Sequence, residues 1–330
     1  MAFSSFSSSF IMAASPRRVV FCVGDRPAET AATWAWACTH VLEPARDRLT
    51  LLRAFTGNRA KEGASKVKVE AGGPPPEWAP PLTEESWSAF AQGTRAVELS
   101  SPILLPEGAA IADYLASLSQ HEAADLVIVG SRGRDSRMAR LIIGSASAFL
   151  VEEGVAPIIV VRPMAAAVAE PATPRIGGLA GTRKVALAVD PKPAVAAALA
   201  RWAAATVLRP TDAVLLMHGP GSKAVAGDVR AATIAALEAL GPWSDANPHA
   251  AKPEVVMLAD GDVRDALVDK INEEACDIAI LGRRSGGSLL RRPVLGSVSS
   301  YVLHHAGACG VLVVPNELLE GGVTARDNDF

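Results

Sequence analysis

The chain has 330 residues, of which 49% are hydrophobic and 20% charged, and a formal net charge of −3. Two domains of ordinary size are expected at this length, and the apolar fraction is high enough to build buried cores instead of a disordered, solvated chain. The charge excludes a general basic field of the kind that attracts nucleic acid, and no segment reaches the roughly 18 apolar residues of a spanning helix, so neither nucleic acid nor a membrane is expected as a partner.

The N-terminal segment 1–16, MAFSSFSSSFIMAASP, is rich in serine, lacks acidic residues and precedes Arg17 and Arg18. We interpret it as an N-terminal tail of a cytoplasmic protein, with a cleaved plastid transit peptide as the minor alternative. The cysteines show neither a C-x-x-C spacing nor a zinc-ligand pattern, which favours buried thiols in a reducing compartment. They are Cys22, Cys38, Cys276 and Cys309.

The predicted elements of the first half alternate between strands and helices. Strands are predicted at 19–23, 49–52, 126–130 and 158–161, which are short, continuous apolar runs typical of strands covered on both faces. Helical stripes with i, i+3, i+4, i+7 spacing lie between them. The stripes are Ala31, Trp34, Cys38 and Val41, and then Ile111, Tyr114, Leu115 and Leu118. The Pro- and Gly-rich stretch 56–82 reads as a surface insertion.

The second half repeats the first. RRVVFCVGDRPAETAATWAWACTHVL (17–42) aligns without gaps on RKVALAVDPKPAVAAALARWAAATVL (183–208), and DLVIVG (125–130) matches DIAILG (277–282). Strands that alternate with helices predict a parallel sheet with helices on both faces, so each copy should form a doubly wound α/β domain. The expected organisation is a tail at 1–16, a domain at 17–163, a linker at 164–182, a domain at 183–315 and a tail at 316–330.

Each copy carries a glycine-bounded segment that begins where the strand at 126–130, or its repeat ending at 282, ends. These segments are GSRGRDSRMARLIIGS (130–145) and GRRSGGSLLRRPVLGS (282–297), and both contain arginines, Arg283 among them. Ligands of doubly wound sheets bind at the carboxyl ends of the strands, and a helix that begins directly after Gly-Ser offers unpaired N–H groups to an anion. Two interpretations of each serine stay open: it donates a hydrogen bond to a phosphate, or it caps its own helix.

The order of elements and the pattern G-x-x-G, about nine residues, then G-[S/T] before the last helix resemble the universal stress protein family, here in tandem. LGSVSSYVLHHA (295–306) is close to the wording of that family. The resemblance covers 17–163 and 183–315. It implies an adenine-nucleotide α-hydrolase-like, Rossmann-like fold in each half. It also implies that ATP, with or without Mg²⁺, or another adenine nucleotide is held by the glycines and the serine, with an Asp at the end of the first strand facing the ribose and phosphates.

Neither copy matches that motif completely. In the first copy Gly24 stands in the place of the Asp and Asp25 follows it, while in the second Ser285 replaces the second glycine and Gly286 follows. We slightly favour the first half as the phosphate site because its glycine pair is intact. The residues that the resemblance assigns to the nucleotide are Asp25, Gly130, Gly133, Gly144 and Ser145 in the first half and Asp190, Gly282, Gly286, Gly296 and Ser297 in the second.

Three functions follow from these observations. The favoured one is a nucleotide-binding, stress-linked regulatory or sensor protein. The alternative is a scaffold whose last strands, 158–161 and 311–314, pair the two halves or join two chains into a dimer or larger homo-oligomer. A slow ATPase or a dinucleotide-dependent enzyme is the least favoured, because the sequence offers no Walker motif, no convincing catalytic base and only a weak G-x-G-x-x-A at 219–224. No catalytic or metal-binding residue is predicted.

Overall fold

The structure is a computed structural model, and it describes the chain in two halves. The described residues are 16–23, 27–43, 46–56, 97–99, 103–105, 123–131, 145–153, 156–162, 182–219, 226–248, 250–283, 296–307 and 309–320. The predicted insertion beyond Thr56, the helical stripe of 111–118 and the linker 164–181 lie outside them.

The first half contains β1 (Arg17–Val23), α1 (Pro27–His40), β2 (Asp47–Thr56), β3 (Val97–Leu99), β4 (Ile103–Leu105), β5 (Leu126–Gly130), α4 (Ser145–Glu153) and β6 (Ile158–Val161). The second half contains β7 (Lys184–Ala188), α5 (Pro193–Thr206), β8 (Ala213–His218), α6 (Ala226–Ala246), β9 (Glu254–Met257), α7 (Val263–Glu273), β10 (Ile278–Arg283), α8 (Ser297–His305), β11 (Gly310–Pro315) and α9 (Asn316–Glu320). The predicted C-terminal tail thus begins with a short helix, whose Leu319 is buried.

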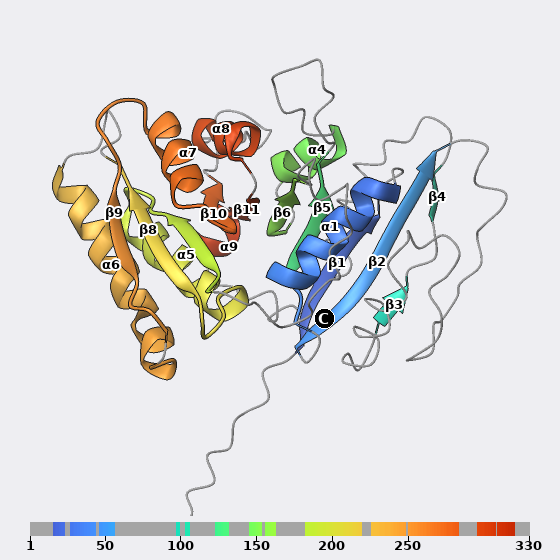
Figure 1. The fold of residues 1–330 in the computed structure, drawn as a ribbon, viewed down its shortest axis with the longest axis horizontal. Coiled ribbons are helices and arrows are strands. Elements are labelled where there is room, and N and C mark those ends of the chain that lie inside the picture. The colour runs from blue at the N-terminus through green and yellow to red at the C-terminus, as the bar shows by residue number, and fades with distance from the viewer. Residues whose placement is uncertain are drawn as a thin grey trace, which may run out of the picture.

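All described strands belong to one 11-stranded sheet, in the order β3-β2-β1-β5-β6-β11-β10-β7-β8-β9 with β4 beside β2 (Figure 1). Within each half the strands run parallel. The chain winds outward from β1 and β7 in one direction, then returns to their other side through β5 and β10. This is the doubly wound arrangement that the alternating sequence pattern predicts, so the predicted fold class is confirmed.

The two half-sheets join through their last strands. β6 and β11 pair antiparallel, with Ile159 opposite Leu312 and Val160 opposite Val311. Because β6 also pairs with β5, and β11 with β10, neither strand has a free edge. A homo-oligomer through these strands would have to displace the pairing within the chain.

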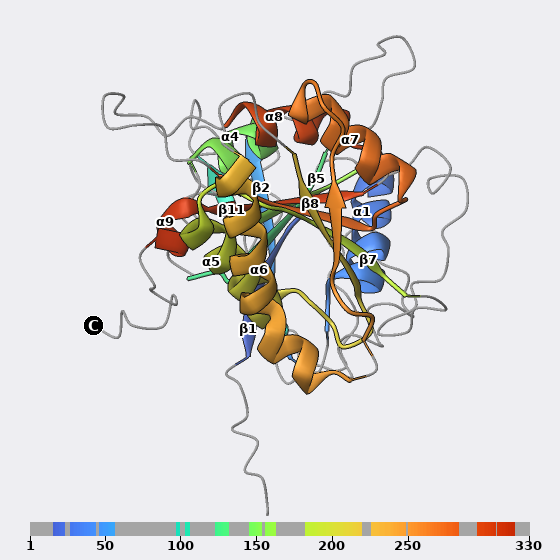
Figure 2. The same ribbon diagram turned by 90° about the vertical axis from the view of Figure 1, so that its left-hand side faces the viewer.

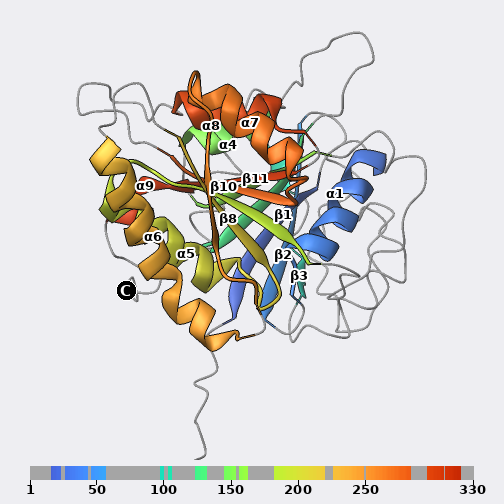
Figure 3. The ribbon, with the colours of Figure 1, turned by 60° about the vertical axis from the view of Figure 1, so that its left-hand side comes forward.

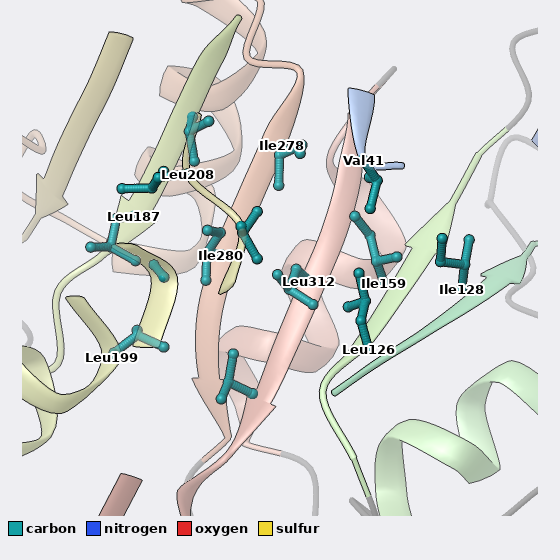
Figure 4. Close-up of a cluster of buried hydrophobic side chains, with 14 of the residues drawn as sticks. Val41, Leu126, Ile128, Ile159, Leu187, Leu199, Leu208, Ile278, Ile280 and Leu312 are labelled. Carbon is teal, nitrogen blue, oxygen red and sulfur yellow. The ribbon is translucent and has the colours of Figure 1, made fainter. Parts of the chain in front are cut away.

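Helices cover both faces of this sheet and form one apolar core on each. α4, α7 and α8 lie together at the top of Figures 2 and 3, and α5 and α6 lie lower, across the strands. The core beneath α1, α5, α6 and α9 crosses the junction between the halves, since it contains side chains of β5, β6, β10 and β11 (Figure 4). In α1, Trp34 packs edge-on against Phe21 with ring centroids 5.1 Å apart, as expected from the stripe on that helix. None of the described helices is both long and apolar enough to cross a membrane.

A reciprocal pair of buried arginines links the halves at the amino ends of the strands. Arg17 forms a bidentate ion pair with Asp47, with N···O distances of 2.8 and 2.7 Å, and its counterpart Arg183 does the same with Asp212. Each guanidinium then reaches across the junction to the carboxyl end of the opposite helix. Arg17 donates to the carbonyl of Thr206 at 2.6 Å, and Arg183 donates to the carbonyl of His40. A cation at a helix carboxyl end interacts favourably with the helix dipole.

A second reciprocal pair acts on the other face of the sheet. Arg162, after β6, donates to the carbonyl of Ala306 at the end of α8, and Arg283, at the end of β10, donates to the carbonyl of Glu152 in α4 at 2.5 Å. The last turns of α1, α4, α5 and α8 are therefore each capped by an arginine from the opposite half. These contacts bury four guanidinium groups in the junction.

Candidate functional site

A pocket of about 130 Å³ opens at the carboxyl ends of β7, β8 and β10. It lies at the point where the strand order reverses, between β7 and β10, which is where doubly wound sheets bind their ligands. The lining residues are Ala188, Val189, Asp190, Pro191, Met217, Gly219, Leu258, Val263, Leu267, Leu281, Gly282, Gly296, Ser297, Val298 and Ser299. Four residues that the sequence assigned to a nucleotide, Asp190, Gly282, Gly296 and Ser297, therefore line one pocket.

The amino end of α8 forms one wall of this pocket. Gly296 is the N-cap, with extended backbone (φ −59°, ψ 145°) and no side chain to bond the first turn. The first intrahelical bond of α8 runs from the Ser300 N–H to the Gly296 carbonyl, at 2.9 Å. The N–H groups of Ser297, Val298 and Ser299 therefore have no acceptor within the helix and are available to an anion. Ser297 is the first helical residue and not the cap, so the capping alternative does not describe it.

Asp190 lies opposite, just after β7. Its Oδ1 accepts a hydrogen bond from the Lys192 backbone N–H at 2.9 Å, which orients the carboxylate at the amino end of α5. A carboxylate here can accept hydrogen bonds from sugar hydroxyls, which the dipole of α8 cannot do. One side of the pocket can thus donate hydrogen bonds to an anion, and the other side can accept hydrogen bonds from hydroxyl groups.

The floor and remaining walls of the pocket are apolar. Met217, Leu258, Leu267 and Leu281 are all buried and belong to the core beneath α7 and α8. Binding pockets for small molecules combine such apolar linings with a few polar groups that fix orientation. An aromatic base with a polar sugar and a phosphate matches this division.

His218, the last residue of β8, is buried against α6 and is not among the residues that line the pocket, and its tautomer follows from its partner. Its Nδ1 lies 3.1 Å from Thr233 Oγ1, and the Thr233 hydroxyl donates to the carbonyl of Val229 at 2.9 Å. Since that hydroxyl proton is used, Nδ1 must carry hydrogen and donate, which leaves Nε2 as an acceptor with no partner among the described residues. Burial lowers the pKa of His218, although the nearby Asp190 opposes that shift.

Two serines that were not predicted as site residues donate hydrogen bonds to glycine carbonyls at the carboxyl ends of β10 and β5. Ser299 Oγ donates to the Gly282 carbonyl at 3.2 Å, and Ser147 Oγ donates to the Gly130 carbonyl at 3.1 Å. Both serines are buried and lie at the third position of α8 and α4. The signal was present in the sequence, because GSAS and GSVS repeat the second serine as well as the first.

The two strand-end glycines serve packing on the face opposite the pocket. A Cβ on Gly130 would lie 2.7 Å from Thr33 Oγ1 of α1, and a Cβ on Gly282 would point toward Asn316 at 3.4 Å. Any contact of these glycines with a phosphate would therefore use their backbone. Arg283, one of the arginines of the second glycine-bounded segment, is buried and donates to the Glu152 carbonyl and to the Glu317 carboxylate.

The first-half counterpart of the pocket is mostly outside the described residues. Asp25, Gly133 and Gly144 fall outside them, and Ser145 is placed as the first residue of α4; Gly286 of the second half also falls outside the described residues. The predicted preference for the first half as the phosphate site therefore stays a prediction.

The chain is similar to one protein family in its second half and to solved structures over most of its length. The sequence model of the universal stress protein family matches residues 181–315. A search of curated proteins found no match.

Among solved structures, a universal stress protein from Archaeoglobus fulgidus DSM 4304 superposes with a TM-score of 0.50 and 13% identity, covering 91% of this chain and 97% of that chain. A universal stress protein from Archaeoglobus fulgidus in complex with dAMP has 22% identity and a TM-score of 0.29, covering 40% of this chain and 96% of that chain. A universal stress protein in complex with cAMP has 21% identity and a TM-score of 0.27, covering 40% of this chain and 95% of that chain.

The fold and the pocket define a Rossmann-like, doubly wound α/β protein with a pocket at its switch point. Residues 181–315 match the universal stress protein family, so the resemblance seen in the sequence is confirmed for the second half, and the similarity to the solved structure extends the fold over most of the chain.

Proposed function

We propose that the chain binds an adenine nucleotide, ATP in the first instance, in the second-half pocket, and that it acts as a stress-linked regulatory or sensor protein. The observation that carries the proposal is the meeting of Asp190 and the uncapped amino end of α8 in one pocket. The nucleotide complexes of two solved universal stress proteins are consistent with this ligand class.

Each side of the pocket has a distinct task in this proposal. The free N–H groups at Ser297 to Ser299 and the Ser297 hydroxyl bind a phosphate, Asp190 accepts from the ribose, and the apolar wall around Met217 and Leu281 covers the base. Micromolar affinity needs about 8 kcal/mol in total, which several such contacts must share.

Ligand identity is tested first on the protein as purified. Mass spectrometry of the small molecules released on denaturation should show an adenine nucleotide, and titration calorimetry with ATP and Mg²⁺ should restore binding to the emptied protein.

The variant Ser297→Glu then tests the location. A carboxylate at the start of α8 repels phosphate but interacts favourably with the helix dipole, so binding should weaken at least about 10-fold, or 1.4 kcal/mol, with folding intact. Ser300→Glu is the matched control, because it adds the same charge where the backbone N–H already bonds Gly296. Protein that releases no nucleotide and binds none would reject the proposal in favour of the scaffold function, and equal weakening in both variants would move the site elsewhere.

A further inference from the structure

The outer edge of β9 is an exposed, apolar sheet edge. β9 is the last strand of the sheet order, paired with β8 on one side and with no described strand on the other (Figure 2). The exposed large hydrophobic residues of the described chain all lie on β9 and on α6 beside it: Ile234 is 45% exposed, Val255 37% and Met257 59%. Such an edge is a template for pairing with another strand, unless charges or a covering element block it.

The direction of the backbone groups in β9 follows from one hydrogen bond. The Leu258 N–H donates to the His218 carbonyl of β8 at 2.8 Å. Because backbone groups alternate in direction along a strand, those of Val256 also face β8, whereas those of Val255 and Met257 face outward. The two residues with exposed apolar side chains are therefore also the two with outward N–H and C=O groups.

We propose that β9 pairs antiparallel with β9 of a second copy of this chain, centred on Val256. In this register Val255 of one copy lies opposite Met257 of the other, and each of these two pairs exchanges both of its backbone hydrogen bonds. Val256 packs toward the α7 side of the sheet, so the side chains of Val255 and Met257 both point to the α6 side. The four exposed side chains of the two strands then meet on one face of the joined sheet, the α6 side.

The same register is complementary in charge. Continued past both ends of β9, it brings Lys252, which precedes the strand, opposite Asp260 of the second copy, which follows it, once on each side of the axis, and both residues are exposed. A strand that is self-complementary in backbone direction and apolar side chains, with complementary charges flanking it, fits a copy of itself better than an unrelated peptide. The strand has only four residues, so the interface falls in the small, weakly binding class and the dimer should dissociate on dilution.

Light scattering after size exclusion tests the dimer over about a 100-fold range of protein concentration. The full chain should move from the monomer mass of 34.2 kDa toward twice that mass as concentration rises. Met257→Glu should leave it monomeric throughout with an unchanged melting temperature, because this side chain is exposed in the monomer. Ser300→Glu, which adds the same charge away from β9, should dimerise like the original chain. A monomer at every concentration, or a dimer that Met257→Glu does not weaken, would overturn the proposal.

Charge reversal tests the register. Lys252→Asp places two carboxylates opposite each other on both sides of the axis and should raise the dissociation constant several-fold. The double variant Lys252→Asp/Asp260→Lys restores the complementarity and should return the constant to within about 2-fold of the original. If the double variant is no better than Lys252→Asp alone, the strands do not pair in this register. None of these residues lines the nucleotide pocket, so the dimer and the proposed nucleotide binding can fail separately.

Discussion

Gly130 and Gly282 occupy matching positions in the two copies, yet the structure predicts opposite responses to the same substitution. A Cβ at Gly130 would lie 2.7 Å from Thr33 Oγ1, well inside the 3.4 Å at which ordinary van der Waals contact begins. Thr33 is buried and its hydroxyl donates to the Glu29 carbonyl at 2.8 Å, so it cannot swing away freely. At Gly282 the nearest atom is Asn316 Oδ1 at 3.4 Å.

The expected magnitudes follow from these distances. Overpacking of this kind costs about 1–3 kcal/mol, offset by about 0.4–1 kcal/mol because alanine restricts the unfolded chain. Gly130 has no left-handed φ, so the backbone itself accepts alanine. Gly130→Ala should therefore lower the free energy of unfolding by about 1–2 kcal/mol, and Gly282→Ala should change it by less than about 0.5 kcal/mol.

Urea unfolding followed by tryptophan fluorescence measures the free energy of unfolding of both variants. A double-mutant cycle of Gly130→Ala with Thr33→Ala tests the contact itself. In a Thr33→Ala background the hydroxyl is gone, so Gly130→Ala should lose most of its effect, which gives a coupling energy of about 1 kcal/mol or more. Equal losses for Gly130→Ala and Gly282→Ala, or additive effects of Gly130→Ala and Thr33→Ala, would refute the packing argument. A loss of nucleotide binding without any loss of stability would instead favour the phosphate role that the sequence suggested for Gly130.

Two further predictions concern buried ionisable groups. Arg183→Met leaves the buried Asp212 carboxylate without its ion-pair partner, with the Arg209 backbone N–H as its remaining donor, and should lower the free energy of unfolding by about 3–5 kcal/mol. Adding Asp212→Leu should restore most of the loss; urea unfolding of both variants checks this, and no recovery in the double variant would contradict the pairing argument. The pKa of His218 is lowered by burial, so the unfolded chain takes up a proton below its ordinary pKa of 6.5 while the folded chain does not, and stability falls as pH drops through that value. His218→Asn keeps a hydrogen-bond donor for Thr233 but cannot titrate, so its free energy of unfolding should fall less between pH 7 and pH 5 than that of the original chain. Part of the fall should remain, because the pKa of His40 is also lowered. Identical pH dependence of the unfolding free energy in the two proteins would exclude His218 as a cause.

The contacts between the halves show where sequence reasoning stopped. Arg17 and Thr206 are 189 residues apart, and nothing in the spacing of either residue indicates that a guanidinium from one copy caps a helix of the other. The alignment does pair Arg17 with Arg183 and so marks both as repeated, but repetition alone does not distinguish a contact within a half from one between halves.

The candidate site was predictable in part for the same reason. Asp190, Gly296 and Ser297 could be placed at one sheet edge because parallel strands end together, and the structure brings them into one pocket. Ser299 was missed although GSAS and GSVS repeat it, because its partner is a backbone carbonyl, that of Gly282, and the repeat does not indicate which group the serine bonds.

The sequence by itself determined the duplication, the order of strands and helices and the doubly wound fold, because these depend on local periodicity and on burial of each strand along its own length. Only the tertiary structure decided that β6 and β11 close the two sheets into one, that arginines of each half donate to the other half, and that β9 ends the described sheet on one side. Those features depend on which distant surfaces meet, and an apolar strand has the same sequence pattern whether its neighbour comes from its own half, from the other half or from a second chain.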